Sequence, residues 1–328
     1  MKKLKILYAG SPLASSIVLK NLINCQSSHN FKIAGVLTNL PSAKGRHSEL
    51  LPTEVAQCAR ENKIPVFEFE HLKSEAREAI SPLNVDLLVS FDYGRIFGPK
   101  FLELFPLGGI NLHPSNLPKY RGCTPVPAAI LNGDKTLGIT VQKLALKTDE
   151  GDILGQTEIS LDGTETTLSL MDGDGKSSRV TDEGSKLLLR ILKEISYSFE
   201  SEDFELLGTK QTGESSYTNF LKKEDGIIDW NKSASKIERK IRAYTPFPLC
   251  STSWNGVKIT ILKARVGEGT TSETAGTVLP YRKSVGIEIA CGDGSILSIT
   301  ELQQEKKKAM DYKSFINGAR GFTGSVLM

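Results

Sequence analysis

The stretch Gly109–Gly122, GINLHPSNLPKYRG, decides the fold prediction, because an apolar strand pattern here carries polar side chains at its end. Residues two apart on an extended strand point to the same face, so Asn111 and His113 present an amide and an imidazole side by side. Pro114 is expected to end the strand, since proline has no N–H for a sheet ladder. The pair is therefore predicted at the tip of a strand, where open α/β sheets place their ligand crevices. From this stretch alone, a hydrogen-bonded structural His and a loop Asn remain an equal alternative.

Strand-like and helix-like segments alternate around this stretch. The expected strands are residues 4–9, 31–38, 65–67, 85–91, 137–144 and 155–161, and the expected helices are residues 14–24, 53–62, 74–80, 99–104, 125–132 and 183–195. Thr53 is a plausible helix N-cap. This alternation favours an α/β fold with a mostly parallel, doubly wound sheet.

The opening strand and helix do not form a dinucleotide site. Gly10 is present, but the second and third glycines of the G-x-G-x-x-G fingerprint are missing. The second strand closes on Thr38-Asn39 instead of an acidic residue. These two absences argue against the hypothesis that the protein is a nicotinamide-dependent dehydrogenase.

The chain after residue 200 differs in kind from the part before it. Residues 200–227 are mostly polar and are predicted to contain a linker, and residues 234–243 form a basic helix. Five short strands are expected at Cys250–Trp254, Lys258–Ala264, Gly276–Leu279, Ser284–Cys291 and Ile296–Leu302. That pattern predicts a small Greek-key barrel, of a kind that often binds oligonucleotides.

Charge and cysteine usage narrow the class of protein. The 328 residues carry a net charge of +3, but residues 206–328 hold 18 Lys/Arg against 12 Asp/Glu. This asymmetry hints at a polyanion bound near the second domain, although an ordinary solvated surface explains it equally well. Five scattered cysteines without a C-x-x-C pair argue against a disulfide framework or a structural zinc site, and no apolar run approaches bilayer length. A reduced cytoplasmic protein without metal is expected.

A carboxylate in the polar turn 147–154, KTDEGDIL, completes a chemical trio. If the turn folds over the strand tip, Asp149 joins Asn111 and His113. Such a trio suits acyl or formyl transfer to an amine: Asn111 and charged His113 stabilise a developing oxyanion, while Asp149 orients the imidazole or accepts the amine's proton. No G-x-S-x-G elbow or metal-ligand spacing suggests another hydrolase design.

Together these motifs resemble the methionyl-tRNA formyltransferase family. The core INLHPSNLPKYRG is followed by TPVPAAILNGD, GITV and TDEGDIL, and AGSP stands near the start. The more specific matches lie in the second domain: I-D-W at Ile228–Trp230, RAYTPFP at Arg242–Pro248, GTVL from Gly276 and KKAM at Lys307–Met310. The resemblance covers almost the whole chain.

The resemblance implies formyl transfer from 10-formyltetrahydrofolate to the amino group of initiator methionyl-tRNA. It implies a Rossmann-like formyltransferase domain at residues 1–199, a linker at 200–215 and an OB-like tRNA-binding barrel at 216–328. Asn111, His113 and Asp149 match the family's catalytic residues. The implied folate contacts are Ser115, Asn116, Leu117 and Pro118, with Val89, Phe91, Tyr93 and Gly94 lining the pterin pocket. The expected tRNA contacts are Lys44, Arg46, Arg121, Lys240, Arg242, Lys306 and Lys307. A monomer is expected.

The sequence also departs from the family pattern. Pro114 stands where glycine is usual and Asn116 where leucine is usual, while Asp92 and Arg95 fill positions that are usually apolar. The loop after Thr38 is less basic than usual, and the interruption DGDGKSSR at 172–179 replaces a continuous helix. Two other hypotheses stay open: a formyltransferase for an amino-sugar nucleotide or glycinamide ribonucleotide, and a non-catalytic RNA-binding protein.

Overall fold

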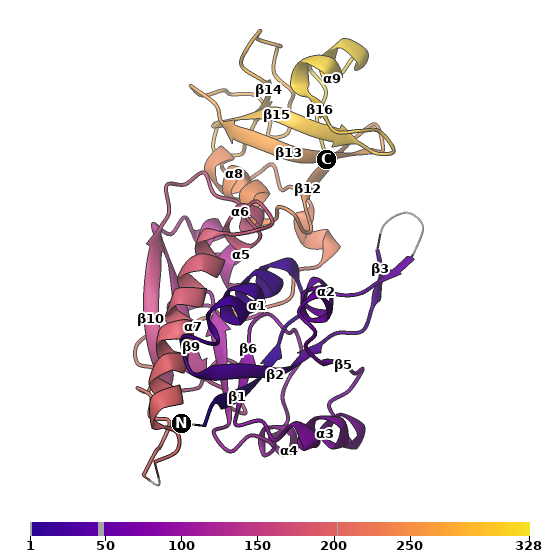
Figure 1. Ribbon diagram of the computed structural model, residues 1–328. Helices are drawn as coiled ribbons and strands as arrows, with labels where there is room; N and C mark the ends of the chain where they lie inside the picture. The colour runs from indigo at the N-terminus through magenta and orange to yellow at the C-terminus, as the bar shows by residue number, and fades with distance from the viewer. Residues whose placement is uncertain (1, 45–48, 202) are drawn as a thin grey trace. The chain divides into compact units, whose positions relative to one another are not determined.

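The computed structural model describes residues 2–44, 49–201 and 203–328 (Figure 1). By contacts, these residues form two compact units. The first unit comprises Met1–Pro125, Thr136–Ser160 and Ser169–Thr218, and the second comprises Val126–Lys135, Leu161–Leu168 and Asn219–Met328. Residues 200–215, predicted as a linker, fall within the first unit.

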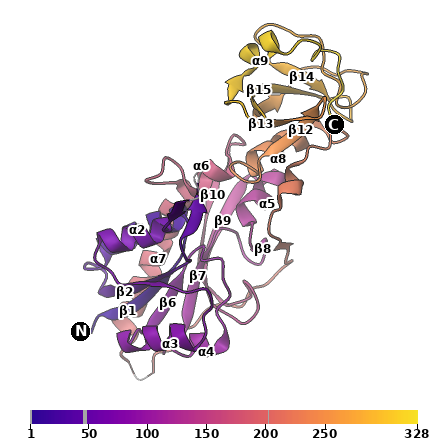
Figure 2. The same cartoon turned by 90° about the vertical axis from the view of Figure 1, so that its right-hand side faces the viewer.

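The first unit is built on a seven-stranded sheet with strand order β10-β9-β7-β6-β1-β2-β5. The strands are β1 (Leu4–Ala9), β2 (Phe31–Thr38), β5 (Val66–Glu68), β6 (Leu87–Ser90), β7 (Gly109–His113), β9 (Thr136–Lys143) and β10 (Ile153–Ser160). The strands from β5 to β7 pair in parallel, and β9 runs antiparallel to both β7 and β10. The predicted mostly parallel sheet is confirmed, and Figure 2 shows β7 between β6 and β9.

Helices cover the sheet of the first unit. They are α1 (Leu13–Cys25), α2 (Glu54–Glu61), α3 (Ser74–Ile80), α4 (Pro99–Leu102) and α7 (Arg179–Ser198); a 3-10 turn, η1 (Ser81–Leu83), follows α3. The α7 helix runs along β9 and β10 (Figure 1). A Cβ atom at Gly184 would lie 2.8 Å from Leu112, so this glycine lets α7 lie close to β7. The structure also extends α7 four residues before its predicted start at Glu183, because Ser178 caps it in a capping box with Thr181.

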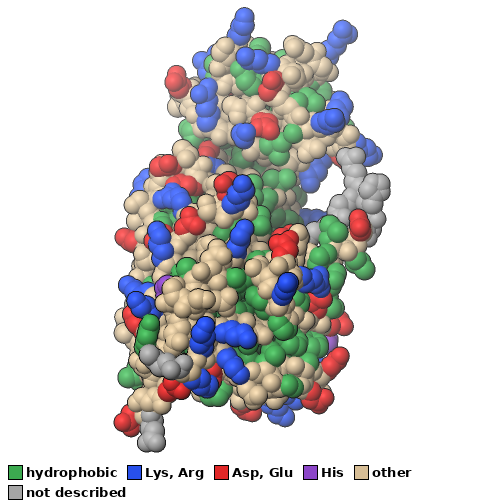
Figure 3. Space-filling model, in the orientation of Figure 1, with side chains coloured by type: hydrophobic (Ala, Val, Ile, Leu, Met, Phe, Trp, Pro, Cys, Tyr) green, Lys and Arg blue, Asp and Glu red, His purple; other side chains and the backbone are tan. Residues whose placement is uncertain are grey.

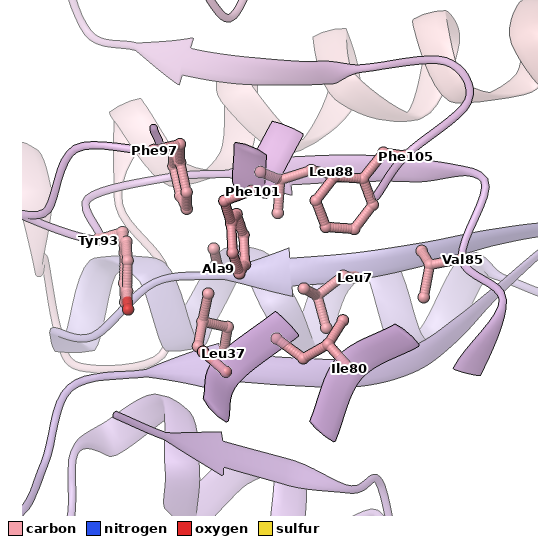
Figure 4. Packing of buried hydrophobic residues seen from close by; sticks show 11 residues of the cluster. Leu7, Ala9, Leu37, Ile80, Val85, Leu88, Tyr93, Phe97, Phe101 and Phe105 are labelled. Atoms are coloured by element: carbon pink, nitrogen blue, oxygen red, sulfur yellow. The ribbon is translucent and has the colours of Figure 1, made fainter. Parts of the chain in front are cut away.

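One face of the sheet is sealed by an aromatic series. Tyr93, Phe97, Phe101 and Phe105 form consecutive ring contacts, with centroids 5.3, 5.8 and 5.6 Å apart. Figure 4 shows these rings over Leu7, Leu37 and Leu88 of the parallel strands. Burial of apolar surface contributes about 25 cal/mol of stability per Å², so this packing stabilises the carboxyl end of the parallel strands, where β6 ends.

Shorter elements complete the first unit. Strands β3 (Ser42–Lys44) and β4 (Glu49–Leu51) pair antiparallel, and α2 begins shortly after β4 ends. Thr53 caps α2, as predicted, by accepting a hydrogen bond from the N–H of Ala56. The two-residue strands β8 (Arg121–Gly122) and β11 (Tyr217–Thr218) pair in parallel. By the division given above, helix α5 (Pro125–Asn132) falls almost entirely in the second unit, and helix α6 (Thr167–Met171) contains the boundary between Leu168 and Ser169.

The second unit holds an antiparallel sheet of short strands. These are β12 (Cys250–Trp254), β13 (Val257–Val266), β15 (Ile296–Gln304) and β14 (Ile287–Ala290), with β16 (Met310–Asp311) paired to β15; the helices are η2 (Lys223–Gly226), α8 (Ala234–Ala243) and α9 (Tyr312–Gly318). The predicted strand Gly276–Leu279 is wrong: single bridges join Thr277 to Val326 and Val278 to Ile289. Gly276 has φ +89°, which is incompatible with an extended strand start.

Candidate active site

The predicted pair lies at the carboxyl end of the parallel strands. Asn111 pairs with Ser90 of β6, and Ser90 pairs with Ala9 of β1, so three strand ends meet there. The chain leaves β1 for β2 on one side, whereas β6 continues to β7 on the other. This is the topological switch point at which open α/β sheets bind ligands.

His113 is buried and its orientation is fixed. Its Nε2 lies 2.9 Å from the carbonyl oxygen of Tyr120. Because a carbonyl only accepts, Nε2 carries the proton and donates it to Tyr120. The other ring nitrogen, Nδ1, therefore faces Asp149, with 3.7 Å between Nδ1 and Oδ2. A second proton on Nδ1 would complete an ion pair with that carboxylate.

Asp149 is held by donors on both carboxylate oxygens. The backbone N–H of Gly122 donates to Oδ2 at 2.8 Å, and the Gln142 amide donates to Oδ1 at 2.7 Å. Asp149 has φ +55°, and a Cβ atom at the nearby Gly151 would lie 1.8 Å from the Lys143 carbonyl oxygen. The tight turn thus depends on Gly151, and it brings the carboxylate over the strand tip as predicted.

The side chain of Asn111 is the open member of the trio. It is partly exposed, and none of the described residues forms a hydrogen bond with its amide. Gln142 stands directly opposite Asn111 on β9, so both side chains lie on the same face of the sheet. The free amide is therefore available to a bound substrate, while Gln142 is occupied with Asp149.

Two glutamines and an arginine support the Asp149 turn, and sequence reasoning did not single out the glutamines. Gln211 donates to the carbonyl oxygens of Asp149 and Gly151, each at 2.8 Å. Its own oxygen accepts from Arg121, at 3.1 Å from Nε and 2.7 Å from Nη2. Arg121, predicted to contact tRNA, is thus engaged at the active site.

Tyr217 closes this network from the outside. Its hydroxyl accepts from Arg121 at 2.8 Å and donates to Glu150 at 2.6 Å. The bond from Tyr217 is the main reason that the pKa of Glu150 is lowered, with smaller effects from the charges of Lys147 and Arg121. Strand β11 and the residues before it are therefore part of the wall of the site.

The predicted folate-contacting residues divide into buried and accessible ones. Ser115 is fully buried and donates to the Lys119 carbonyl, and the Leu117 side chain is also buried. Pro118 is partly buried and Asn116 is exposed. The side chains of Val89, Phe91 and Tyr93 lie inside the core, and Gly94 is exposed with φ +77°. Just after β6, a bound molecule can therefore reach the exposed residue Asp92 and the backbone of Gly94.

Asp92 and Arg95, the two departures after β6, occupy defined positions. Arg95 donates to the Asn39 side chain at 2.5 Å, and Asn39 in turn donates to the Tyr93 carbonyl. Asp92 has φ +50°, and its backbone carbonyl accepts from the N–H of Ser11. Desolvation, followed by the charge of Asp172, raises the pKa of Asp92 to about 6. A carboxyl with a raised pKa therefore lies just after the end of β6.

The predicted tRNA contacts lie on separate parts of the chain. Lys44 ends β3, and Arg46 falls outside the described residues. In the second unit, Lys240 donates to the Ile227 carbonyl, and Arg242 bonds Glu238 and the Glu165 carbonyl. Lys306 and Lys307 are exposed in the turn after β15. Lys and Arg side chains are spread over the second unit on the face shown in Figure 3.

Comparison with known proteins identifies this geometry. The model "Formyl transferase" matches residues 2–192, and "Formyl transferase, C-terminal domain" matches residues 221–320. Methionyl-tRNA formyltransferase of Treponema denticola is 42% identical over 97% of this chain and 98% of its own length. The Borrelia hermsii protein of the same name is 36% identical over 98% and 99%.

Solved structures share the fold at lower identity. HypX from Aquifex aeolicus in complex with tetrahydrofolic acid has a TM-score of 0.61 at 18% identity, covering 98% of this chain and 48% of that one. Methionyl-tRNA formyltransferase from Clostridium thermocellum has a TM-score of 0.52 at 16% identity, covering 80% and 93%.

The fold and the site define a formyltransferase that uses 10-formyltetrahydrofolate as formyl donor. Within that class, the chain belongs to the methionyl-tRNA formyltransferase family. Across residues 2–44, 49–201 and 203–328, no helix is long and apolar enough to cross a membrane. No group of three or more His, Cys, Asp or Glu in the same residues is placed to hold a metal ion.

Proposed function

We propose that this chain transfers the formyl group of 10-formyltetrahydrofolate to the α-amino group of initiator methionyl-tRNA. The observation that carries the proposal is the convergence of His113 and Asp149 beside the Asn111 amide, which bonds to none of the described residues, at the switch point of the sheet. Full-length similarity to proteins named methionyl-tRNA formyltransferase supports the choice of amine.

Each member of the trio has a separate role in the proposal. Asn111 donates a hydrogen bond to the formyl oxygen, on which negative charge develops as the amine attacks. The charged form of His113 directs Nδ1–H at Asp149, since Nε2–H is already committed to Tyr120, and its positive charge favours the negative charge that develops in the site. Asp149 stabilises that imidazolium and accepts the proton that the attacking amine loses, directly or through a water. The bond between the formyl carbon and the folate nitrogen then breaks, and that nitrogen takes up a proton and leaves as tetrahydrofolate.

The free Asn111 amide fits a formyl-bearing co-substrate. A hydrogen-bond donor aimed at developing charge accelerates acyl transfer when it is held in place before the reaction. Residues Ser115 to Pro118 would hold the folate from one side and the backbone at Gly94 from the other. Ser115 and Leu117 act there by fixing the loop, because their side chains are buried.

The second unit is proposed to bind the tRNA. Lys306 and Lys307 in the exposed turn after β15 are offered as phosphate contacts, with Lys44 and Arg46 contributing from the first unit. Lys240 and Arg242 contribute to the local positive potential, although their side chains are engaged within the unit. We further infer a monomer that acts in the cytoplasm, where translation is initiated; sedimentation and cell fractionation test those two points.

The deciding experiment measures formyl transfer to methionyl-tRNA with 10-formyltetrahydrofolate, for wild type beside His113→Ala and Asp149→Asn. Wild-type turnover that falls by about 100-fold or more in both variants supports the roles and the substrate together. Transfer to an amino-sugar nucleotide or glycinamide ribonucleotide alone would overturn the tRNA substrate. Tight RNA binding without folate-dependent transfer to any amine would favour a non-catalytic RNA-binding protein.

A further inference from the structure

Residues 209–218, at the end of the first unit, form hydrogen bonds with the active site at several points. Thr209 exchanges backbone hydrogen bonds with Ile153, at 2.7 and 2.8 Å. The Ser216 hydroxyl accepts from the N–H of Tyr120, the residue whose carbonyl holds His113. The segment 209–218 thus supports both sides of the His113–Asp149 pair.

Gln211 makes the contacts in this segment that bear directly on the Asp149 turn. Its amide orientation is fixed, because the Arg121 guanidinium can only donate and must face the Gln211 oxygen. The NH₂ group of Gln211 therefore faces the carbonyls of Asp149 and Gly151. Both N–H bonds of one amide are spent on the backbone on either side of Glu150.

Gln211 also faces the second support of the carboxylate. The oxygen of the buried Gln142 side chain lies 3.3 Å from Gln211 Nε2, while Gln142 Nε2 donates to Asp149. A carboxylate cannot donate, so this orientation of Gln142 is fixed as well. A shift of Gln211 would release the turn and the amide that holds Asp149 Oδ1.

We propose that Gln211 is a positioning residue for formyl transfer, which holds the Asp149 turn so that the carboxylate faces His113 Nδ1. The inference rests on the proposed roles of His113 and Asp149. Gln211 contacts the backbone of Asp149 but neither its carboxylate nor His113, so its loss should lower kcat with little change in the KM for either substrate. The expected loss is about 10- to 100-fold, by analogy with the residues that orient the ligands of metal sites.

Two variants separate the two ends of the Gln211 amide. Gln211→Ala removes both contacts. Gln211→Glu keeps an oxygen for Arg121 and strengthens that pair, but it removes the two N–H donors to the turn. Both variants are expected to lose kcat while each keeps a cooperative thermal unfolding transition. Glu214→Ala, on the same segment and exposed, is the control and should keep wild-type kcat and KM.

A double-mutant cycle with Asp149→Asn tests whether Gln211 acts through Asp149. In the Asp149→Asn background, Gln211→Ala should cost less than 2-fold in kcat. Full activity in Gln211→Glu would overturn the proposal in favour of a role in anchoring Arg121. A raised KM for methionyl-tRNA at unchanged kcat would assign Gln211 to binding. Wild-type turnover in Asp149→Asn itself would instead refute the proposed function, whatever the Gln211 variants do.

Discussion

His113 and Tyr120 are joined by a 2.9 Å hydrogen bond from the imidazole Nε2 to the backbone carbonyl. This bond decides which ring nitrogen is available to the site, because it leaves Nδ1 as the nitrogen directed at Asp149. Tyr120 can play this part because it has φ +59°, which turns its carbonyl back toward the strand end. The orientation of the proposed catalytic imidazole is therefore set by backbone geometry seven residues further along the chain.

Replacing Asn111 is expected to affect catalysis and not folding. In Asn111→Ala, kcat should fall by about 100- to 1000-fold, the usual result of removing one donor to a developing oxyanion. The unfolding midpoint should stay within about 2 °C, a shift equivalent to about 1 kcal/mol at most, because the amide has no described partner. Steady-state kinetics and thermal unfolding check the two halves. A kcat within 3-fold of wild type would remove Asn111 from the proposed mechanism.

Gly122→Ala should damage both stability and turnover. Gly122 has φ +98°, and an added Cβ would lie 2.3 Å from the Thr218 carbonyl oxygen, so β11 or the loop must move. The same movement withdraws the N–H that donates to Asp149. Gly213→Ala is a matched control: it has φ +99°, but a Cβ there meets nothing within 4 Å. Gly213→Ala should lower the free energy of unfolding by only about 1–2 kcal/mol, the cost of a left-handed backbone conformation for alanine. A loss of kcat in Gly213→Ala as large as that in Gly122→Ala would contradict the steric argument.

Asp92 should make stability depend on pH. A carboxyl whose pKa is raised from 3.8 to about 6 binds more protons in the folded than in the unfolded chain between those values. The free energy of unfolding therefore falls as pH rises through this window. Asp92→Asn removes that fall, so the variant should be more stable than wild type at pH 7 and equal to it near pH 3. Because Asp92 is exposed, solvent screening keeps the difference small.

Asp174→Asn gives the opposite sign and serves as the comparison. Backbone N–H groups of Ser177 and Lys176 lower the pKa of Asp174. Its stabilising contribution is present at neutral pH and is lost as pH falls. Denaturant unfolding from pH 3 to 7 measures both variants. An Asp92→Asn curve parallel to that of wild type would show that the pKa of Asp92 is not raised.

Tyr93→Phe is expected to leave the enzyme active and at least as stable. The Tyr93 hydroxyl is buried without a hydrogen-bond partner among the described residues, and desolvation raises its pKa to about 12. Removing an unsatisfied buried hydroxyl spares its desolvation cost, about 1 kcal/mol or more. Urea unfolding measures the gain. A raised KM for 10-formyltetrahydrofolate would instead show that the hydroxyl binds the folate, as the family resemblance implies for Tyr93.

Lys306 and Lys307 are expected to contribute salt-dependent binding. Each phosphate contact that is lost should reduce the slope of log K against log salt by about 1. The double variant Lys306→Ala/Lys307→Ala should therefore bind methionyl-tRNA more weakly at low salt, with a slope lower by about 2 and kcat unchanged. Lys73→Ala, an exposed lysine of the first unit, is the control. An unchanged slope would remove this turn from the tRNA-binding surface.

Much of the first unit could be predicted from sequence. The alternation of apolar strands and amphipathic helices predicts the parallel core of the sheet, because buried positions recur in the sequence with the period of each strand or helix. The pair Asn111 and His113 at the end of β7, and Thr53 as an N-cap, followed from rules of side-chain direction and capping. In the second unit, the alternation predicts short strands, but it wrongly includes Gly276–Leu279, since local pattern does not reveal a left-handed glycine.

The sequence by itself determined which residues could perform the chemistry: an amide, an imidazole and a carboxylate in motifs typical of formyltransferases. Only the tertiary structure decided how they are held. The tautomer of His113, the two donors to Asp149 and the part played by Gln211 all depend on contacts between segments far apart in the chain. Gln211 lies 69 residues from Gln142 and 90 from Arg121. A polar residue in a polar stretch carries no local signal of such contacts, because the partners that satisfy it are brought together only by folding.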